Sequence, residues 1–232
     1  MKSMRPLALL VVCLLLVPGL MLAEAAPRSR FQGDTPPPDV PRGDRAPESC
    51  FEDAVFIGDS LMAGLELHGV FPDSLYAATV GISPHTALGR VFDTNTGKKT
   101  LKEILSAADF SKVYVLMGAN AVDNAGSGAA AARYARFLDK LVSAYPDKLV
   151  YVLSIPPRAS RGMTKIIGGF NRVLRKICGE RGIYYLDLFS RMLDSEGLAL
   201  QQYLAMDGIH LSRQGSDFVR DFIMSHTVKE GP

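Results

Sequence analysis

Short apolar runs alternate with amphipathic stretches from about residue 49 to residue 226. Five of the runs are rich in Val, Ile, Leu, Tyr and Phe and have the length of buried strands. They cover residues 54–57, 76–80, 112–117, 148–155 and 182–188. Strands that are apolar on both faces and separated by helices indicate a parallel sheet with helices on both sides.

The stretches between these runs have helical periodicity. One apolar stripe ends before Pro146 and consists of Tyr134, Phe137, Leu138, Leu141, Val142 and Tyr145. Residues 164–180 and 216–225 predict two further helices, and Thr100 with Glu103 has the pattern of a capping box at a helix start. Because right-handed crossovers place the loop after each parallel strand along one carboxyl edge, we expect an active site at that edge.

Residues 1–25 have the parts of a secretory signal. Lys2 and Arg5 precede an apolar run, which ends in the small residues of Ala23-Glu24-Ala25. We predict a signal peptide cleaved after Ala25, and the alternative is an uncleaved membrane anchor. Under either interpretation the rest of the chain is exported, and is secreted or held at the outer face of the membrane.

Residues 26–48 contain six prolines among charged and small residues. This composition predicts an extended, disordered linker, which leaves residues 49–232 as the folded domain. Two cysteines remain outside the signal, Cys50 and Cys178. In an oxidising compartment they permit a disulfide, and the alternative is two buried free thiols.

Composition and charge exclude some classes of protein. The 26 Lys and Arg against 24 Asp and Glu give a net charge of +2, and no basic stripe is visible. We therefore expect no nucleic-acid partner. The cysteines lack the spacing of a zinc site, and we predict neither a metal nor an organic cofactor. We expect a monomer whose one contact with a membrane is through residues 1–25.

Four short motifs lie at the ends of predicted elements. Three of them follow the first three predicted strands, and the fourth lies in the loop before the last predicted helix. Ser60, in Gly58-Asp59-Ser60-Leu61, opens a helix whose positive dipole end favours a developing anion, although a plain N-cap is the alternative. Gly81 and Asn120 follow the second and third strands, where they form turns or donate to an oxyanion. Asp207 precedes His210 by three residues, so its carboxylate can hold the imidazole.

Together, in this order, the motifs resemble those of the GDSL, or SGNH, hydrolase family from residue 54 to residue 215. The resemblance implies a flavodoxin-like three-layer α/β/α sandwich with a mostly parallel five-stranded sheet, and a serine hydrolase that acts on esters. Ser60 is then the nucleophile, His210 the general base and Asp207 the residue that orients it. The oxyanion hole is formed by the Ser60 N–H, the Gly81 N–H and the Asn120 side-chain amide.

One motif departs from the family pattern, since the third block often continues with Asp and here Ala121 follows Asn120. Asp123 is a nearby candidate to replace that carboxylate. Several other residues are candidates for the rim of the site or, alternatively, for exposed loop positions: His85, Arg158 and Arg161. His68 and His226 have no aspartate at a useful spacing, and we expect them at the surface.

The leading functional hypothesis is an exported esterase that removes O-acyl groups, acetyl by default, from cell-surface or environmental glycans. The same triad serves an acyltransferase, because an acyl-enzyme reacts with whichever acceptor reaches it. A hydrolase of lipid esters or thioesters is a further alternative. A non-catalytic glycan-binding module would keep the fold, but the complete set of site residues argues against it.

Overall fold

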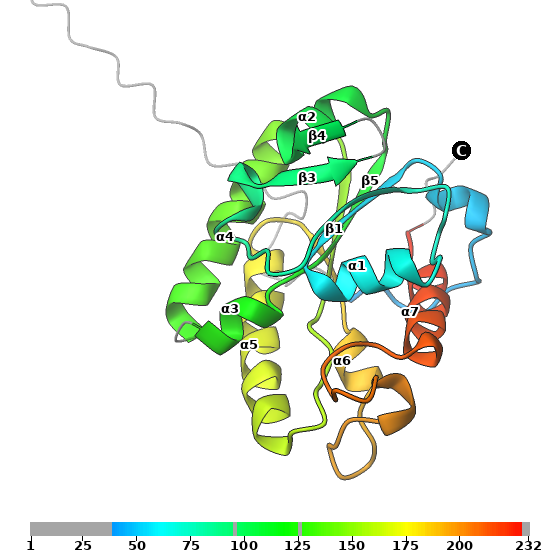
Figure 1. The fold of residues 1–232 in the computed structure, drawn as a ribbon, viewed down its shortest axis with the longest axis vertical. Coiled ribbons are helices and arrows are strands. Elements are labelled where there is room, and N and C mark those ends of the chain that lie inside the picture. Colours follow the sequence, from blue (N-terminus) through cyan, green and yellow to red (C-terminus); the bar gives the residue numbers. More distant parts are fainter. Residues whose placement is uncertain (1–38, 95–96, 125–126, 229–232) are drawn as a thin grey trace, which may run out of the picture.

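A computed structural model describes residues 39–94, 97–124 and 127–228 (Figure 1). The predicted signal and most of the proline-rich stretch therefore lie outside the described residues. Among the helices of the described ranges, none is both long and apolar enough to cross a membrane.

Five parallel strands form the central sheet. They are β1 (Ala54–Gly58), β2 (Leu75–Ala78), β5 (Lys112–Leu116), β6 (Leu149–Leu153) and β7 (Tyr184–Leu186). Their order is β2-β1-β5-β6-β7, which is the doubly wound order of flavodoxin-like folds. This confirms the predicted fold class and all five predicted strands, each of which is found within a few residues of its expected bounds.

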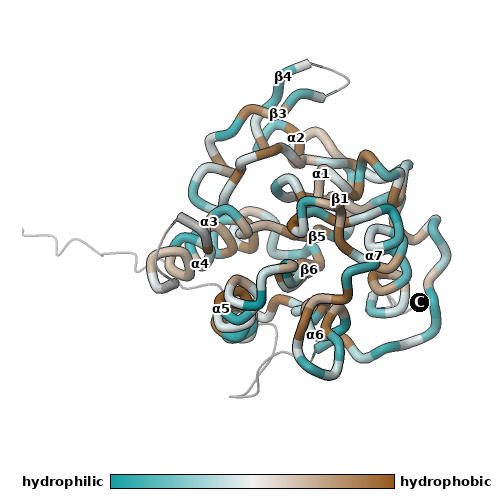
Figure 2. The backbone as a smooth tube through the Cα atoms, turned by 60° about the horizontal axis from the view of Figure 1, so that its bottom comes forward, coloured by the Kyte–Doolittle hydropathy of each residue, from teal (hydrophilic) through white to brown (hydrophobic). Residues whose placement is uncertain are grey.

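Helices cover both faces of the sheet. The helices α4 (Ser127–Ala144) and α5 (Arg161–Gly179) lie on one side, and α1 (Ser60–Leu67) and α7 (Arg213–Ser225) on the other (Figures 1 and 2). In Figure 2 the apolar stretches of the tube gather where the helices face the strands. Since the three central strands β1, β5 and β6 are buried on both faces, they are nearly continuous apolar runs, as the sequence indicates.

A row of aromatic rings crosses all five strands in register. Adjacent rings are stacked with centroids between 4.7 and 5.1 Å apart, in the order Tyr76, Phe56, Tyr114, Tyr151 and Tyr184. The row lies on the side of α1 and α7, because the Tyr114 hydroxyl contacts Thr227 just after α7. These offset contacts add to the area that the rings bury, and they pin the register of each strand pair.

The remaining elements connect the strands at their ends. The helix α2 (Leu101–Ala107) begins with the predicted capping box, in which Thr100 and Glu103 bond each other's backbone N–H. A two-stranded antiparallel hairpin, β3 (Val91–Thr94) and β4 (Gly97–Thr100), precedes it and was not expected from the sequence. Its exposed polar residues lack the alternation that marks a strand. Two short helices were also missed, α3 (Ala119–Asn124) and α6 (Leu188–Arg191).

The end of the proline-rich stretch differs from the predicted disordered linker. Residues 39–46 pack along the domain, with Val40 and Ala46 buried. The Gly43 and Ala46 N–H groups donate to the last turn of α7, and Asp39 pairs with Arg175 of α5 at 2.7 Å. Two apolar anchors and paired charges thus hold this segment in place despite its proline content. We call residues 39–46 the N-terminal strap.

The two cysteines and His226 differ from what the sequence indicated. The structure has no disulfide between the cysteines: Cys50 is an exposed free thiol and Cys178 a buried one, so neither the bridge nor the pair of buried thiols is found. His226 is only 9% exposed, against the surface position that was expected. His68 is half-buried, and its Nδ1 lies 2.7 Å from the Ser216 hydroxyl, which joins α1 to α7.

We predict that the N-terminal strap contributes to stability and that the residues before it do not. A chain that begins at residue 39 should unfold at the temperature of a chain that begins at residue 26. A chain that begins at residue 48 should lose roughly 2–4 kcal/mol, because it lacks the two buried apolar side chains of the strap and its two backbone hydrogen bonds. Thermal and urea unfolding of the three chains measures this. Equal stability for all three would show that the strap is not part of the fold.

Candidate active site

The first site residue follows β1 in a tight turn. A Cβ on Gly58 would lie 2.2 Å from the Leu116 carbonyl oxygen and 2.4 Å from the Met62 Cβ, so only glycine lets β1 and α1 approach β5 this closely. The chain then enters α1 at Ser60, whose side chain is half-buried. The nucleophile candidate therefore stands at a helix N-terminus, where the helix dipole favours negative charge.

A buried carboxylate lies beneath this turn. Asp59 has no exposed surface, and its Oδ1 accepts the Leu61 N–H of α1 at 3.0 Å. Its Oδ2 accepts the N–H groups of Gly118 and Ala119 at 3.0 and 3.3 Å. Burial raises the pKa of Asp59 to about 6, although the three N–H donors and the charge of His210 oppose the rise. Asp59 thus joins the loop of Ser60 to the loop of Asn120.

The fourth motif folds on itself at the opposite side of the site. The Asp207 Oδ1 accepts the backbone N–H groups of Ile209 and His210 at 2.9 and 3.0 Å, and its Oδ2 lies 2.6 Å from the His210 Nδ1. The hydrogen bond to His210 and those two backbone N–H groups lower the pKa of Asp207 to about 2. A carboxylate can only accept, so the Nδ1 carries the proton and the Nε2 of the neutral ring keeps its lone pair.

This loop is held against the rest of the carboxyl edge by Gly208. Its φ is +66°, and its carbonyl accepts the Ala159 N–H at 2.9 Å in the loop after β6. A Cβ on Gly208 would lie 2.6 Å from the Ala159 Cβ. The close packing sets the position of His210, whose Nε2 lies 2.9 Å from the Ser60 hydroxyl. The structure therefore brings Ser60, His210 and Asp207 into one continuous hydrogen-bonded chain.

The two remaining predicted residues are linked to each other. Gly81 follows β2 with a φ of +77°, and the carbonyl of the next residue, Ile82, accepts the Asn120 side-chain N–H at 3.2 Å. Asn120 is the second residue of α3, after the Gly118 turn that Asp59 holds. The loops after β1, β2 and β5 are thus connected by side chain to backbone contacts at the same edge of the sheet (Figure 1).

Other predicted rim residues are less involved. His85 is exposed, as is Arg161 at the start of α5. The backbone of Arg158 is fixed by Thr164, whose hydroxyl donates to its carbonyl at 2.7 Å. The backbone of Asp123 lies in α3, but its side chain lies outside the described residues.

Comparison with known proteins identifies the family. A model of the GDSL-like lipase/acylhydrolase family matches residues 56–218. The chain belongs to this family. This confirms the predicted resemblance and the expectation of an esterase-type hydrolase. No curated protein sequence matches the chain.

Solved structures of GDSL hydrolases share the fold at low sequence identity. A GDSL-like lipase from Bacteroides thetaiotaomicron is 18% identical with a TM-score of 0.59, and the match covers 76% of this chain and 88% of that one. The lipase/acylhydrolase from Enterococcus faecalis is 16% identical with a TM-score of 0.55, and the match covers 74% of this chain and 93% of that one. The psychrotrophic esterase EstA from Pseudoalteromonas is 16% identical with a TM-score of 0.53, and the match covers 75% of this chain and 96% of that one.

The sequence of this GDSL hydrolase did not reveal every residue that shapes the site. In the sequence Asp59 is only a member of the motif around Ser60, and its bonds to Gly118 and Ala119 join segments 59 and 60 residues apart. The one signal of this role in the sequence is the position of Asp59 directly after an apolar strand. A carboxylate that is buried there needs hydrogen-bond donors. The contact of Gly208 with Ala159 gives no signal in the sequence beyond the glycine itself.

We predict that Asp59→Asn lowers kcat of this GDSL hydrolase by up to about 100-fold, because a charge-assisted acceptor of three N–H groups becomes a neutral amide. The substitution should also change how the rate declines on the acid side of its pH profile. In the wild type the buried Asp59 carboxylate takes up a proton as the pH falls, whereas the variant has no carboxylate there, so the decline becomes shallower. Steady-state rates from pH 4.5 to 8 measure both effects.

Stability provides the second measurement for Asp59. Its folded pKa of about 6 exceeds the usual 3.8, so the folded state binds more protons than the unfolded state between these values. Stability from this group therefore falls as the pH rises from about 4 to about 6. Asp59→Asn should remove that slope. An unchanged slope and an unchanged pH profile would contradict the role given to Asp59.

Proposed function

We propose that this GDSL hydrolase is an exported serine esterase that removes small O-acyl groups, acetyl above all, from glycans. The observation that carries the proposal is the hydrogen-bonded chain from Asp207 through His210 to the Ser60 hydroxyl, at 2.6 and 2.9 Å. Export rests on the signal-like residues 1–25, which lie outside the described residues.

The geometry supports a two-step acyl transfer. The Ser60 Oγ attacks the ester carbonyl carbon while the His210 Nε2 takes its proton, and Asp207 stabilises the imidazolium that forms. The tetrahedral intermediate then loses the alcohol, to which His210 returns the proton. Water attacks the resulting acyl-enzyme by the same sequence in reverse, which releases the acid and restores the Ser60 hydroxyl.

Charge on the carbonyl oxygen needs donors that are already in place. The Ser60 N–H at the start of α1, the Gly81 N–H and the Asn120 amide are the proposed donors. The Asn120 contact with the Ile82 carbonyl favours this role, because it ties the Gly81 turn to the loop of Asn120. Donors that are held by the fold need no reorganisation when the charge develops.

The openness of the site favours a bulky alcohol partner. About half of the side-chain surface of both His210 and Asp207 is exposed, so a polymer can present one of its acyl groups at the edge of the sheet. This is the reason to prefer a glycan ester over a substrate that must be enclosed.

A lipid ester is the second candidate, and a specific observation favours it. Three apolar side chains next to site residues in the sequence are exposed: Val80 at 73%, Met206 at 108% and Ile209 at 39%. Such residues suit contact with an acyl chain or a lipid surface. Transfer to a sugar hydroxyl instead of water is a third outcome that the same triad permits.

We predict that an alkyl fluorophosphonate labels Ser60 and that Ser60→Ala abolishes both labelling and turnover, with kcat reduced by at least about 10³-fold. The structure of EstA inhibited by monoethylphosphonate makes a phosphonate a suitable probe. Ser83→Ala, in the exposed loop after Gly81, is the matched control and should retain both. Mass spectrometry of the labelled peptide identifies the serine, and labelling of Ser60→Ala would reject it as nucleophile.

The same preparation decides between substrates. Acetylated glycans and p-nitrophenyl esters of rising chain length are compared by kcat/KM. Preference for acetyl esters with release of acetate from a glycan supports the proposal. Preference for long acyl chains supports the lipid ester, and acyl-sugar products in place of free acid identify a transferase.

We predict different defects for the two residues that support Ser60 and His210. Asp207→Asn loses the acceptor that selects the productive tautomer and should lower kcat by up to about 10⁴, as in a serine-protease triad. Asn120→Ala loses one oxyanion donor and should lower kcat by about 10²–10³ without moving the pH profile. Rates from pH 5 to 9 compare them. Near-normal activity of Asp207→Asn would mean that His210 is not held by Asp207.

A further inference from the structure

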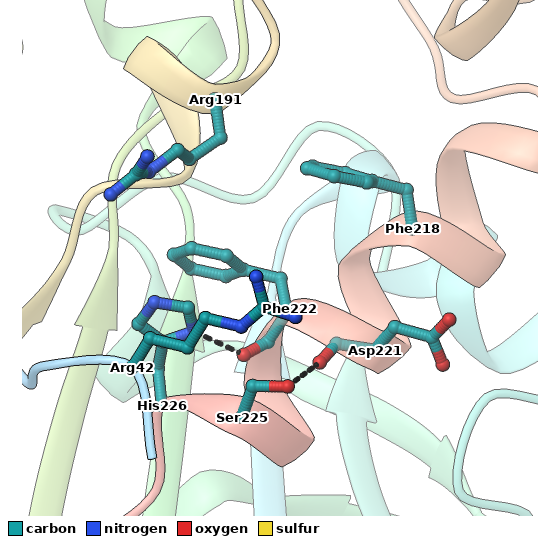
Figure 3. Close-up of a pocket in the computed structure, with 7 residues that line it drawn as sticks. All are labelled: Arg42, Arg191, Phe218, Asp221, Phe222, Ser225 and His226. Atoms are coloured by element: carbon teal, nitrogen blue, oxygen red, sulfur yellow. Dashed lines mark hydrogen bonds between the residues drawn. The ribbon is translucent and has the colours of Figure 1, made fainter. Parts of the chain in front are cut away.

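A cavity of about 210 Å³ lies beside the C-terminal half of α7, and none of the triad residues lines it (Figure 3). Three separate segments form its wall. Arg42 comes from the N-terminal strap and Arg191 from the end of α6. The other lining residues come from α7 and the residue after it: Phe218, Asp221, Phe222, Ser225 and His226.

Two positive charges converge on this cavity. Within the described part of the chain, neither the Arg42 nor the Arg191 guanidinium forms an ion pair or a hydrogen bond, whereas Arg45 and Arg220 both pair with Asp221. Both guanidinium groups are near enough to His226 to affect it. Burial lowers the pKa of that ring, and the positive charges of Arg191 and Arg42 lower it further. The strap therefore brings a second arginine to a place where α6 already supplies one.

The one carboxylate of the wall does not neutralise them. In Figure 3 the Asp221 side chain points away from Arg42 and His226. It pairs instead with Arg45 at 2.8 Å and lies 3.6 Å from Arg220. Ser225 also turns aside, because its hydroxyl donates to the Asp221 carbonyl at 2.8 Å. The cavity keeps a net positive lining.

His226 completes the lining with a fixed ring. Its Nδ1 donates to the Phe222 carbonyl at 2.7 Å, and the ring stacks on Phe222 with centroids 4.0 Å apart. The Nε2 is left as the atom that can meet a ligand, as an acceptor when neutral and as a donor when protonated. Arg42, Arg191 and His226 are the charged or titratable groups directed at this space, one from each of the three segments.

We propose that this cavity, the Arg42–Arg191 cavity, binds one oxyanion group: a carboxylate, a sulfate or a phosphate. Guanidinium groups match the geometry of such anions with paired N–H donors. The volume is below that of ordinary ligand pockets and suits a single small group. Phe218 and Phe222 offer apolar ring surface beside it, which suits the carbon frame of an organic acid such as a uronic acid.

The cavity and the triad share no residue, so the proposal holds whether or not the chain proves to be a glycan esterase. Should both hold, the cavity would recognise an acidic sugar in the same polymer that carries the acyl group. The row of stacked rings Tyr203, Phe218, Phe222 and His226 runs from the loop before Asp207 to the cavity.

The test uses the imidazole NMR signals of the four histidines at constant ionic strength. The probes are inorganic phosphate, sulfate, galacturonate and uncharged galactose. We expect phosphate and at least one other anion to shift the His226 signal saturably, while exposed His85 is unaffected and galactose has no effect. A tighter response to galacturonate than to the inorganic ions identifies an organic acid as the ligand class, and the reverse identifies a free ion.

Variants make the assignment specific. Arg42→Gln and Arg191→Gln should each weaken binding about tenfold or more, because each removes a charge-assisted hydrogen-bond donor. Arg90→Gln, an exposed arginine beside β3, is the matched control and should bind as the wild type does. Both cavity arginines are exposed, so thermal unfolding should be unchanged. The proposal is overturned if no anion shifts His226 saturably, or if both cavity variants bind as tightly as the control.

Discussion

The buried carboxylate of Asp59 organises the carboxyl edge of the sheet, where the candidate active site lies. A charge without exposed surface needs donors of its own, and the three N–H groups around Asp59 come from two loops far apart in the sequence. Meeting that requirement holds the start of α1, with Ser60, against the start of α3, with Asn120. The need of one buried group for hydrogen bonds therefore sets the distance between Ser60 and Asn120, the proposed nucleophile and oxyanion donor.

The other half of the edge is built in the opposite way. Asp207 and His210 are almost half exposed and are held by bonds within one short loop. That loop meets the rest of the protein where Gly208 packs on Ala159 and accepts its N–H, and where the His210 ring meets the Ser60 hydroxyl. A self-contained unit of this kind can keep its internal geometry while these contacts set its position. The site thus combines a buried half, held together around Asp59, with an exposed half, the Asp207–His210 loop, which is positioned by its contacts with neighbouring loops.

These differences explain how far the sequence was predictive. The strands, the order of the site residues along the carboxyl edge and the helix start at Thr100 all depend on local periodicity or short motifs, and the structure agrees with them. The contacts of Asp59 with Gly118 and of the strap with α7 join distant segments, so no local pattern contains them. The strap shows the limit of composition as a guide: the prolines of residues 26–48 indicate disorder, while two apolar side chains and paired charges hold residues 39–46 in place.

The aromatic row through the sheet has a consequence for how this protein can be observed. The chain has no tryptophan and eight tyrosines, and four of these, Tyr76, Tyr114, Tyr151 and Tyr184, stand in the row with one phenylalanine between two of them. Rings stacked this closely couple electronically, so near-ultraviolet circular dichroism of the native protein should be dominated by the row. A slip of one residue between two strands would turn one ring to the other face and break the coupling. The protein therefore carries a built-in optical signal for the alignment of its own sheet.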